Sequence, residues 1–269
     1  MASIALFGVR ARFRWPRTRR RVVRALRSLP LSVRVVLSLA VVVALWFAAN
    51  AVYQVVRKPS ELFFPVSGTL EKTPPETWRE YARAFRAHAT PVMTPALLAA
   101  LAQVEGAGNP VARTYWRWRP TWRPFELYRP ASSAVGMYQI TDGTFAEAKR
   151  YCIPDHAVAE RGSWHDLGSC WFNGLYTRVV PSHAVEMTSA LLDVEVARAV
   201  ARQRIRSATL RQKQALAAVI HLCGAAAGDA YARRGFRPTR GQRCGEQDVR
   251  RYVSRVEAMR RVFERLAAG

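Results

Sequence analysis

The chain has 269 residues, half of them hydrophobic, and a formal net charge of +23 at pH 7. This length allows one or two domains, and so high a charge is common among nucleic-acid-binding proteins. The charge is unevenly distributed, however, because residues 1–34 contain ten arginines and no acidic residue. Residues 57–269 retain 32 basic and 19 acidic residues, which is a net charge of +13.

The first predicted element is a membrane-spanning helix. Residues 35–56 are 22 uncharged, mostly apolar residues, and at about 1.5 Å per residue such a helix crosses a hydrocarbon core of about 30 Å. The basic segment 1–34 predicts a cytoplasmic N-terminus, and therefore a single-pass inner-membrane protein with a periplasmic remainder. The tripeptide at 49–51 has the A-x-A form of a signal-peptidase site, so cleavage is the alternative to an uncleaved anchor. Both alternatives place residues 57–269 outside the cytoplasm, which argues against nucleic acid as a partner.

A proline-rich stretch follows the predicted span. Residues 57–76 contain four prolines and one glycine without helical periodicity, so we expect a linker there. Residues 77–269 form the predicted globular domain, and no strand pattern or internal repeat stands out in them. This domain is expected to be mainly α, with helices from residue 76 onward, over 95–106, near 142, and over 184–206, 209–223 and 246–267.

Four cysteines in the exported part predict two disulfides, because their number is even and the compartment is oxidising. Three pairings are possible, and the shortest loops join Cys152 to Cys170 and Cys223 to Cys244. A zinc site is not expected, because no two cysteines have the close C-x₂₋₄-C spacing of structural sites and no histidine pair accompanies them.

Glu105 is the candidate catalytic residue. Leu98, Leu101 and Glu105 are spaced at i, i+3 and i+7, which places the carboxyl group on the apolar face of its helix. Glu105 also lies in the last turn, where the helix dipole disfavours additional negative charge. Both features suit a group that donates a proton. A solvated glutamate at a frayed helix end is the alternative that periodicity alone leaves open.

Four segments support the catalytic interpretation. The sequence ALAQVEGAGNPVA at 100–112 has a glutamate at a helix end followed by Asn-Pro-x-Ala, and SSAVGMYQITDGTF at 132–145 contains Gly-x-x-Gln before a short predicted helix. The third and fourth segments are LAAV at 216–219 and DVRRYV at 248–253. Each segment is weak by itself, but together and in this order they resemble the four signatures of the SLT-type lytic transglycosylases, over about residues 90–260.

This resemblance implies a lysozyme-like helical fold and cleavage of the bond between N-acetylmuramic acid and N-acetylglucosamine in peptidoglycan. It implies that Glu105 first protonates the glycosidic oxygen and then takes the proton of the muramoyl 6-hydroxyl, which leaves a 1,6-anhydro end. The substrate's own N-acetyl group can stabilise the positive centre, so neither a metal nor a cofactor is implied. The implied substrate-binding residues are Ser133, Gly136, Met137, Tyr138, Gln139 and Tyr252. For Met137, a place in the core is the alternative.

The chain departs from the family close to Glu105. Gly106 replaces the usual serine, Ser133 replaces a glycine, and Val-Ile replaces the Tyr-Asn pair expected after the Leu-Ala-Ala sequence. In the family that tyrosine helps to hold the glutamate, so another residue must do so here. Tyr252 and His221 are the candidates, and Tyr252 is preferred because the fourth signature places it nearby.

A long insertion, residues 113–129, separates the first two signatures. It contains three tryptophans, two tyrosines and five arginines. Two interpretations fit this composition equally well: sugar stacking with pairing to stem-peptide carboxylates, or a loop whose aromatic side chains pack on the domain.

The sequence therefore predicts a membrane-anchored lytic transglycosylase, a lyase that acts on peptidoglycan strands and could serve a cell-envelope or secretion assembly. A basic surface would concentrate it on the polyanions of the wall. A muramidase that uses water for the same cleavage is the nearest alternative. A catalytically silent glycan-binding or scaffold module is the third, because the Tyr-Asn pair is missing.

Overall fold

The computed structural model describes residues 28–160, 162 and 169–269. The chain divides into two units, one that ends at Tyr53 and a larger one that comprises Gln54–Gly269. Most of the predicted basic segment, residues 1–27, lies outside the described residues.

The helix α2 (Leu31–Arg57) contains the predicted membrane span. In the described part of the chain, it is the one helix that is long and apolar enough to cross a membrane. Its 27 residues give a length of about 40 Å, at about 1.5 Å per residue. Nearly all of its apolar side chains are exposed, so the helix does not contribute to a protein core.

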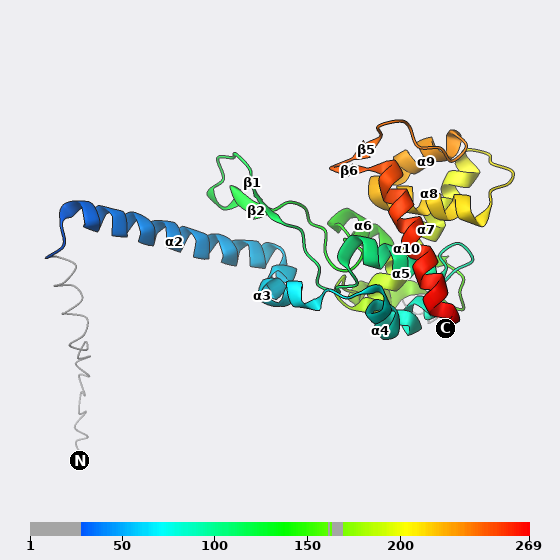
Figure 1. Cartoon of the computed structure of the whole chain (residues 1–269), viewed down its shortest axis with the longest axis horizontal. Helices are drawn as coiled ribbons and strands as arrows, with labels where there is room; N and C mark the ends of the chain where they lie inside the picture. The colour runs from blue at the N-terminus through cyan, green and yellow to red at the C-terminus, as the bar shows by residue number, and fades with distance from the viewer. Residues whose placement is uncertain (1–27, 161, 163–168) are drawn as a thin grey trace, which may run out of the picture. The chain divides into compact units, whose positions relative to one another are not determined.

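The larger unit is mainly α, as predicted (Figure 1). Its α-helices are α3 (Phe64–Ser67), α4 (Pro74–Ala87), α5 (Pro95–Gly106), α6 (Asp142–Ala148), α7 (Pro181–Arg202), α8 (Leu210–Cys223), α9 (Ala225–Arg233) and α10 (Val249–Ala268). Its 3₁₀-helices are η1 (Pro59–Phe63), η2 (Gly68–Leu70), η3 (Pro124–Glu126) and η4 (Cys170–Leu175). The sequence predicted these α-helices except for α3 and α9.

Three small antiparallel hairpins, which the sequence did not predict, connect the helices. They are β1 (Trp116–Trp118) with β2 (Tyr128–Pro130), β3 (Tyr151–Cys152) with β4 (Ala159–Glu160), and β5 (Arg243–Cys244) with β6 (Gln247–Asp248). In the first, Trp116 lies opposite Pro130 and Trp118 opposite Tyr128. Such short strands carry too few residues for an alternating pattern to be recognised.

Helix α5 lies in the core and packs against α4 and α10. Its start is fixed by Thr94, whose hydroxyl accepts a hydrogen bond from the Leu97 amide, and by Pro95 in the first turn. All seven residues from Ala96 to Ala102 are buried. Four of them are alanines, and such small side chains let the neighbouring helices approach closely. The helix ends where Ala107 takes a left-handed conformation, with φ 48°.

Residues 57–76, where the sequence predicted a linker, have regular local structure. This segment forms η1, α3, η2 and the start of α4, and it bonds to the residues that follow α5. The Lys72 amide donates to the Ala107 carbonyl at 2.8 Å, and the side-chain amide of buried Asn109 donates to the Ser67 carbonyl. The segment is therefore packed onto the domain.

Both predicted disulfides are confirmed. Cys152 pairs with Cys170, and Cys223 pairs with Cys244, with Cα–Cα distances of 5.4 and 5.5 Å. The second bond joins the C-terminal end of α8 to the β5–β6 hairpin, which leads directly into α10. It therefore ties together two helices that contribute to the candidate site.

Candidate functional site

Glu105 lies in the last turn of α5 and is mostly buried. Its side chain is 16% exposed, and its Oε1 atom accepts a hydrogen bond from the Tyr252 hydroxyl at 2.5 Å. These two residues are 147 positions apart in the sequence and come from the first and fourth signature segments. A carboxyl group in this position is held in one orientation and keeps limited access to solvent.

Tyr252 is held by the start of α10. Asp248 caps this helix by accepting the Arg251 amide at 2.8 Å, so the first turn is well ordered around the tyrosine. Burial, and next the nearby Glu105 carboxylate, raises the pKa of Tyr252 well above its ordinary value. The hydroxyl therefore stays protonated and donates a hydrogen bond to Glu105. Tyr252, which was predicted to bind substrate, is only 1% exposed, so it contacts Glu105 from within the core and presents almost no surface to a bound molecule.

His221, from the last turn of α8, completes the surroundings of Glu105. Its Nε2 atom lies 3.8 Å from Glu105 Oε1, and its side chain is 11% exposed. Three helices, α5, α8 and α10, therefore converge on one carboxyl group. Both residues that the sequence offered in place of the missing tyrosine lie beside Glu105, with Tyr252 in direct hydrogen-bond contact.

The second signature segment packs against Gly106. A Cβ atom at this glycine would lie 2.9 Å from the Met137 Cα atom and 3.0 Å from the Met137 carbonyl oxygen. These distances are too short for a side chain, so the backbone at 137 occupies the space that a serine would need here. A residue larger than glycine at position 106 would therefore require this backbone to move.

A tight turn presents the second signature segment. Val135 and Ile140 form an isolated antiparallel bridge, and between them Gly136 has φ +80°. A Cβ atom at Gly136 would lie 2.4 Å from the Arg178 carbonyl oxygen, so this glycine permits close approach of protein backbone and not of a sugar. Gln139 closes the turn by donating to the Gly136 and Ala112 carbonyls at 2.9 and 3.2 Å.

Three further predicted substrate-binding residues of this segment make other contacts, and Met137 has the place in the core that was its alternative. Met137 and Tyr138 are fully buried, and the Tyr138 hydroxyl donates to the Leu98 carbonyl at 3.1 Å. They therefore support the site from within the core and do not form a groove wall. Ser133 accepts the Asp142 amide at 3.1 Å and lines a separate cavity of about 730 Å³. Among the predicted substrate-binding residues, Gln139 lines a cavity that it shares with His221, the neighbour of Glu105.

That cavity has a volume of about 290 Å³ and includes both Gln139 and His221. Thr141, Thr144 and Thr188 also line it, as do Glu147 and Glu195. Such a mixture of donors and acceptors suits the hydroxyl and amide groups of an amino sugar. Glu195 is a residue that the sequence did not single out.

Glu195 is an anchored carboxylate and differs from Glu105. It forms ion pairs with Arg198 at 2.7 Å and with Arg202 at 3.7 Å. In the described part of the chain, Glu105 has no arginine or lysine within ion-pair distance, and His221 is its one basic neighbour.

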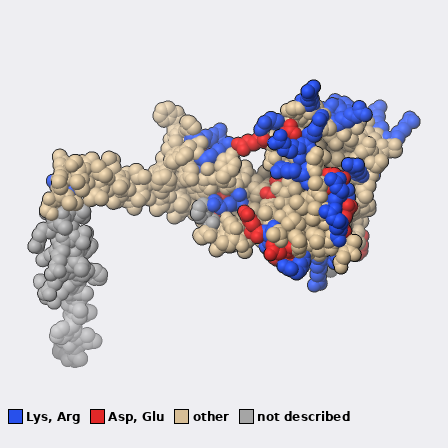
Figure 2. Space-filling view, in the orientation of Figure 1, with Lys and Arg blue, Asp and Glu red and all other residues tan. Residues whose placement is uncertain are grey.

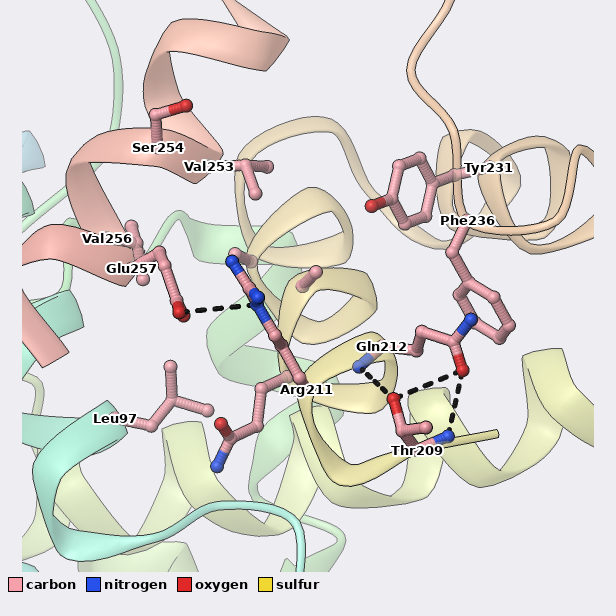
Figure 3. A pocket seen from close by; sticks show the side chains of 13 residues that line it. Leu97, Thr209, Arg211, Gln212, Tyr231, Phe236, Val253, Ser254, Val256 and Glu257 are labelled. Atoms are coloured by element: carbon pink, nitrogen blue, oxygen red, sulfur yellow. Dashed lines mark hydrogen bonds and ion pairs between the residues drawn. The ribbon is translucent and has the colours of Figure 1, made fainter. Parts of the chain in front are cut away.

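Another cavity, of about 370 Å³, lies at the N-terminal end of α5 (Figure 3). Leu97 lines it, and Leu97 lies eight residues before Glu105, which is about 12 Å along the helix axis. In Figure 3, Arg211 of α8 points toward Glu257 of α10, and the two form an ion pair at 3.4 Å. This cavity therefore contains no part of the Glu105 site.

The insertion between the first two signatures forms the β1–β2 hairpin. The Trp116 and Trp118 rings both pack on Tyr128 in tilted arrangements, with ring centroids 5.3 and 4.8 Å away. Trp118 nevertheless remains 62% exposed, and Trp122 is 103% exposed. Aromatic side chains of the insertion therefore pack on one another within the hairpin while others are exposed to solvent, and sugar stacking stays a prediction.

Comparison of the chain with protein-family models, with curated proteins and with solved structures finds no match. Four sequence segments that are far apart in the chain meet at Glu105 and Gly106: the first contains both residues, the second contacts Gly106, the third precedes His221, and the fourth contains Tyr252.

Proposed function

We propose that this protein is a peptidoglycan lytic transglycosylase in which Glu105 is the acid and base. The observation that carries the proposal is the hydrogen bond from Tyr252 to Glu105 within a mostly buried site where three helices converge. A positioned carboxyl group with restricted solvent access is what proton transfer to a glycosidic oxygen requires.

The proposed reaction uses the glutamate twice. Its proton passes to the glycosidic oxygen as the bond from that oxygen to the anomeric carbon breaks. The resulting Glu105 carboxylate then takes the proton of the muramoyl 6-hydroxyl, and the 6-oxygen forms the new bond to the anomeric carbon. No water is consumed, and Glu105 returns to its starting state.

The surroundings of Glu105 support a mechanism with a single carboxylate. The Tyr252 hydroxyl can stabilise the carboxylate after the first proton transfer, because charge-assisted hydrogen bonds are the stronger ones. The cavity beside His221 offers Gln139, Thr141 and Thr144 to a sugar, and of the two other glutamates that line it, Glu147 and Glu195, the second is paired with Arg198. A substrate N-acetyl group would then take the part that a second carboxylate plays in other glycosidases.

The proposed location is the periplasmic side of an inner membrane. Helix α2 is long and apolar enough to serve as the anchor, and the two disulfides are typical of an oxidising compartment. The surface of the larger unit carries many lysines and arginines, as Figure 2 shows, and this charge would favour binding to the anionic wall.

The test compares the purified full chain with its Glu105→Gln variant on isolated peptidoglycan. The variant keeps the shape of the side chain but cannot donate or accept the proton, so we expect release of soluble fragments to fall by about 10²- to 10⁴-fold. Glu71→Gln, which changes an exposed glutamate, is the matched control and should stay active. Equal activity of the Glu105 variant and the wild type would reject Glu105 as the acid, and inactivity of all three would favour a glycan-binding module.

A further inference from the structure

The tip of the β1–β2 hairpin is an exposed surface rich in aromatic and basic side chains. Trp118 is 62% exposed, Trp122 is 103% exposed, and Phe125 is 36% exposed. Arg117, Arg119 and Arg123 alternate with the aromatic residues and are exposed as well. The catalytic proposal assigns no task to this surface.

The hairpin is fixed to the last turn of α2. The side-chain amide of Gln54 donates to the Phe125 carbonyl at 2.6 Å, and Arg57 forms an ion pair with Glu126 at 3.1 Å. Gln54 is buried, so this contact is shielded from competing solvent. The hairpin tip therefore lies next to the point where the apolar helix ends.

A second set of contacts fixes the base of the hairpin to η1, the segment directly after α2. The Trp116 indole nitrogen donates to Glu61 Oε2 at 2.9 Å, and Glu61 also pairs with Lys58 at 3.1 Å. The Glu61 side chain is only 1% exposed, so these bonds form a rigid joint. Because the residues that were expected to be a linker are part of this joint, the hairpin cannot drift away from the end of α2.

Tryptophan and arginine side chains are both favoured where a bilayer meets water. Tryptophan is enriched where a bilayer meets water, because its ring is apolar and its N–H is polar. Arginine binds phosphate groups through paired hydrogen bonds, and basic residues are attracted to anionic lipids.

We propose that the hairpin tip is a membrane-binding surface. Trp118, Trp122 and Phe125 enter the interfacial layer of the bilayer that holds α2, and Arg117, Arg119 and Arg123 bind the phosphates of its lipids. This inference rests on the proposed anchoring by α2 but not on catalysis by Glu105. The larger unit would then be held at the bilayer surface at two points, by α2 and by the hairpin tip, and could not reorient freely.

The test reports the surroundings of residue 122 in the full chain. All four cysteines of the protein are in disulfides, so a Trp122→Cys variant offers one free thiol for an environment-sensitive fluorophore. The labelled protein is placed in nanodiscs of phosphatidylglycerol and phosphatidylcholine in equal amounts. We expect a blue-shifted emission, quenching by lipids that carry bromine in their upper acyl chain, and loss of quenching by iodide in the water.

Two control labels make the outcome decisive. Leu210→Cys lies at the start of α8, at the end of the larger unit opposite the hairpin (Figure 1), and should be quenched by iodide and not by brominated lipid. Val43→Cys, in the middle of α2, should report the lipid interior. If the label at 43 reports lipid but the label at 122 behaves like that at 210, the membrane-binding surface is refuted while the anchor stands. A label at 43 that reports water would overturn both.

A sugar-binding role for the hairpin is a further outcome of the same experiment. If the label at 122 shifts only when soluble glycan strands are added, the hairpin binds peptidoglycan and our inference is wrong. Replacing Arg117, Arg119 and Arg123 by glutamine gives a second measurement. It should increase iodide quenching at 122 in the mixed nanodiscs, and no change would contradict the assigned contacts to lipid phosphates.

Discussion

At the scale of single residues, the proposed activity depends on the contacts that orient the Glu105 side chain. The Tyr252 hydroxyl donates to it at 2.5 Å, and burial keeps that hydroxyl protonated. Tyr252→Phe removes the hydrogen bond but preserves the packing of a ring that is 1% exposed. A hydrogen bond to a charged group contributes about 1.5–3 kcal/mol, so kcat should fall by about 10- to 100-fold.

Steady-state kinetics on soluble glycan fragments checks this expectation, and KM should change little because Tyr252 presents almost no surface to a bound molecule. Tyr231→Phe is the matched control, since Tyr231 is also a buried tyrosine but lines the cavity at the other end of α5. A Tyr252→Phe variant with unchanged kcat would show that another group holds the glutamate.

Gly106 gives a prediction that runs against the family pattern. Gly106→Ser would restore the usual residue, yet its Cβ atom would meet the Met137 backbone at 2.9 Å. Backbone cannot move aside as easily as a side chain, so we expect a loss of about 1–3 kcal/mol in the free energy of unfolding. For a unit of this size, the melting temperature should fall by about 2–4 °C per kcal/mol.

Circular dichroism of the full chain in detergent micelles measures this change. Gly143→Ser is the matched control, because a Cβ atom at Gly143 has no neighbour within 4 Å. If both variants melt at the temperature of the wild type, the close approach at Gly106 is not a constraint on this chain.

At the scale of elements, the two disulfides should differ in function though not in stability. They close loops of 18 and 21 residues, so removal of either is expected to cost about 3 kcal/mol by the loop-entropy argument. The bond from Cys223 to Cys244, however, joins the helix of His221 to the hairpin before Tyr252. The other joins β3 to η4, which contribute nothing to the Glu105 site.

The double serine variant at 223 and 244 should therefore lose more activity than the one at 152 and 170, when both are assayed well below their melting temperatures. Equal activity of two equally stable variants would show that the Cys223–Cys244 bond has no part in positioning the site.

Among the elements, the sequence predicts those whose signals are local and misses those that depend on distant partners. Thr94, Pro95 and Gly106 predicted both ends of α5, because capping groups act locally. Helix α9 was missed, because its sequence of alanines and Gly228 shows no apolar stripe. The packing of residues 57–76 was missed too, since it depends on partners such as Asn109 and Trp116 that are far away in the chain.

The same distinction applies to the candidate site. Glu105 and Tyr252 could be predicted from the signature segments, and the structure brings them into contact. Met137, Tyr138 and Gly136 could not be assigned correctly, because a motif does not reveal which of its side chains point into the core. Glu195 has no local signal, since it becomes part of a cavity only through the packing of α7 against α8.

At the scale of the whole molecule, stability should depend on pH through a group of histidines around Glu186. His88 lies 3.7 Å from Glu186, and its pKa is lowered mainly by burial, which outweighs the opposing effect of the glutamate. Burial also lowers the pKa of His183. His156 is the third histidine near this group.

The folded state therefore binds fewer protons than the unfolded state just below the ordinary histidine pKa of about 6.5. The free energy of unfolding should fall as the pH is lowered from about 7 to about 5.5, a range above the ordinary carboxyl pKa values. Thermal melting across this range should show a smaller decrease for His88→Gln than for the wild type. Glu71→Gln, a change at an exposed residue outside this group, is the control, and a slope that is the same in all three proteins would contradict the assignment.

The central claim, that Glu105 drives an intramolecular attack by the 6-hydroxyl, is tested most directly by the mass of the products. Peptidoglycan digested by the full chain is analysed by mass spectrometry, beside a digest by Glu105→Gln. The account predicts fragments with 1,6-anhydro ends, one water lighter than hydrolytic products, and their loss in the variant. Fragments with the mass of the hydrolysed product would show a muramidase, and anhydro fragments in equal amounts from the variant would contradict the role of Glu105.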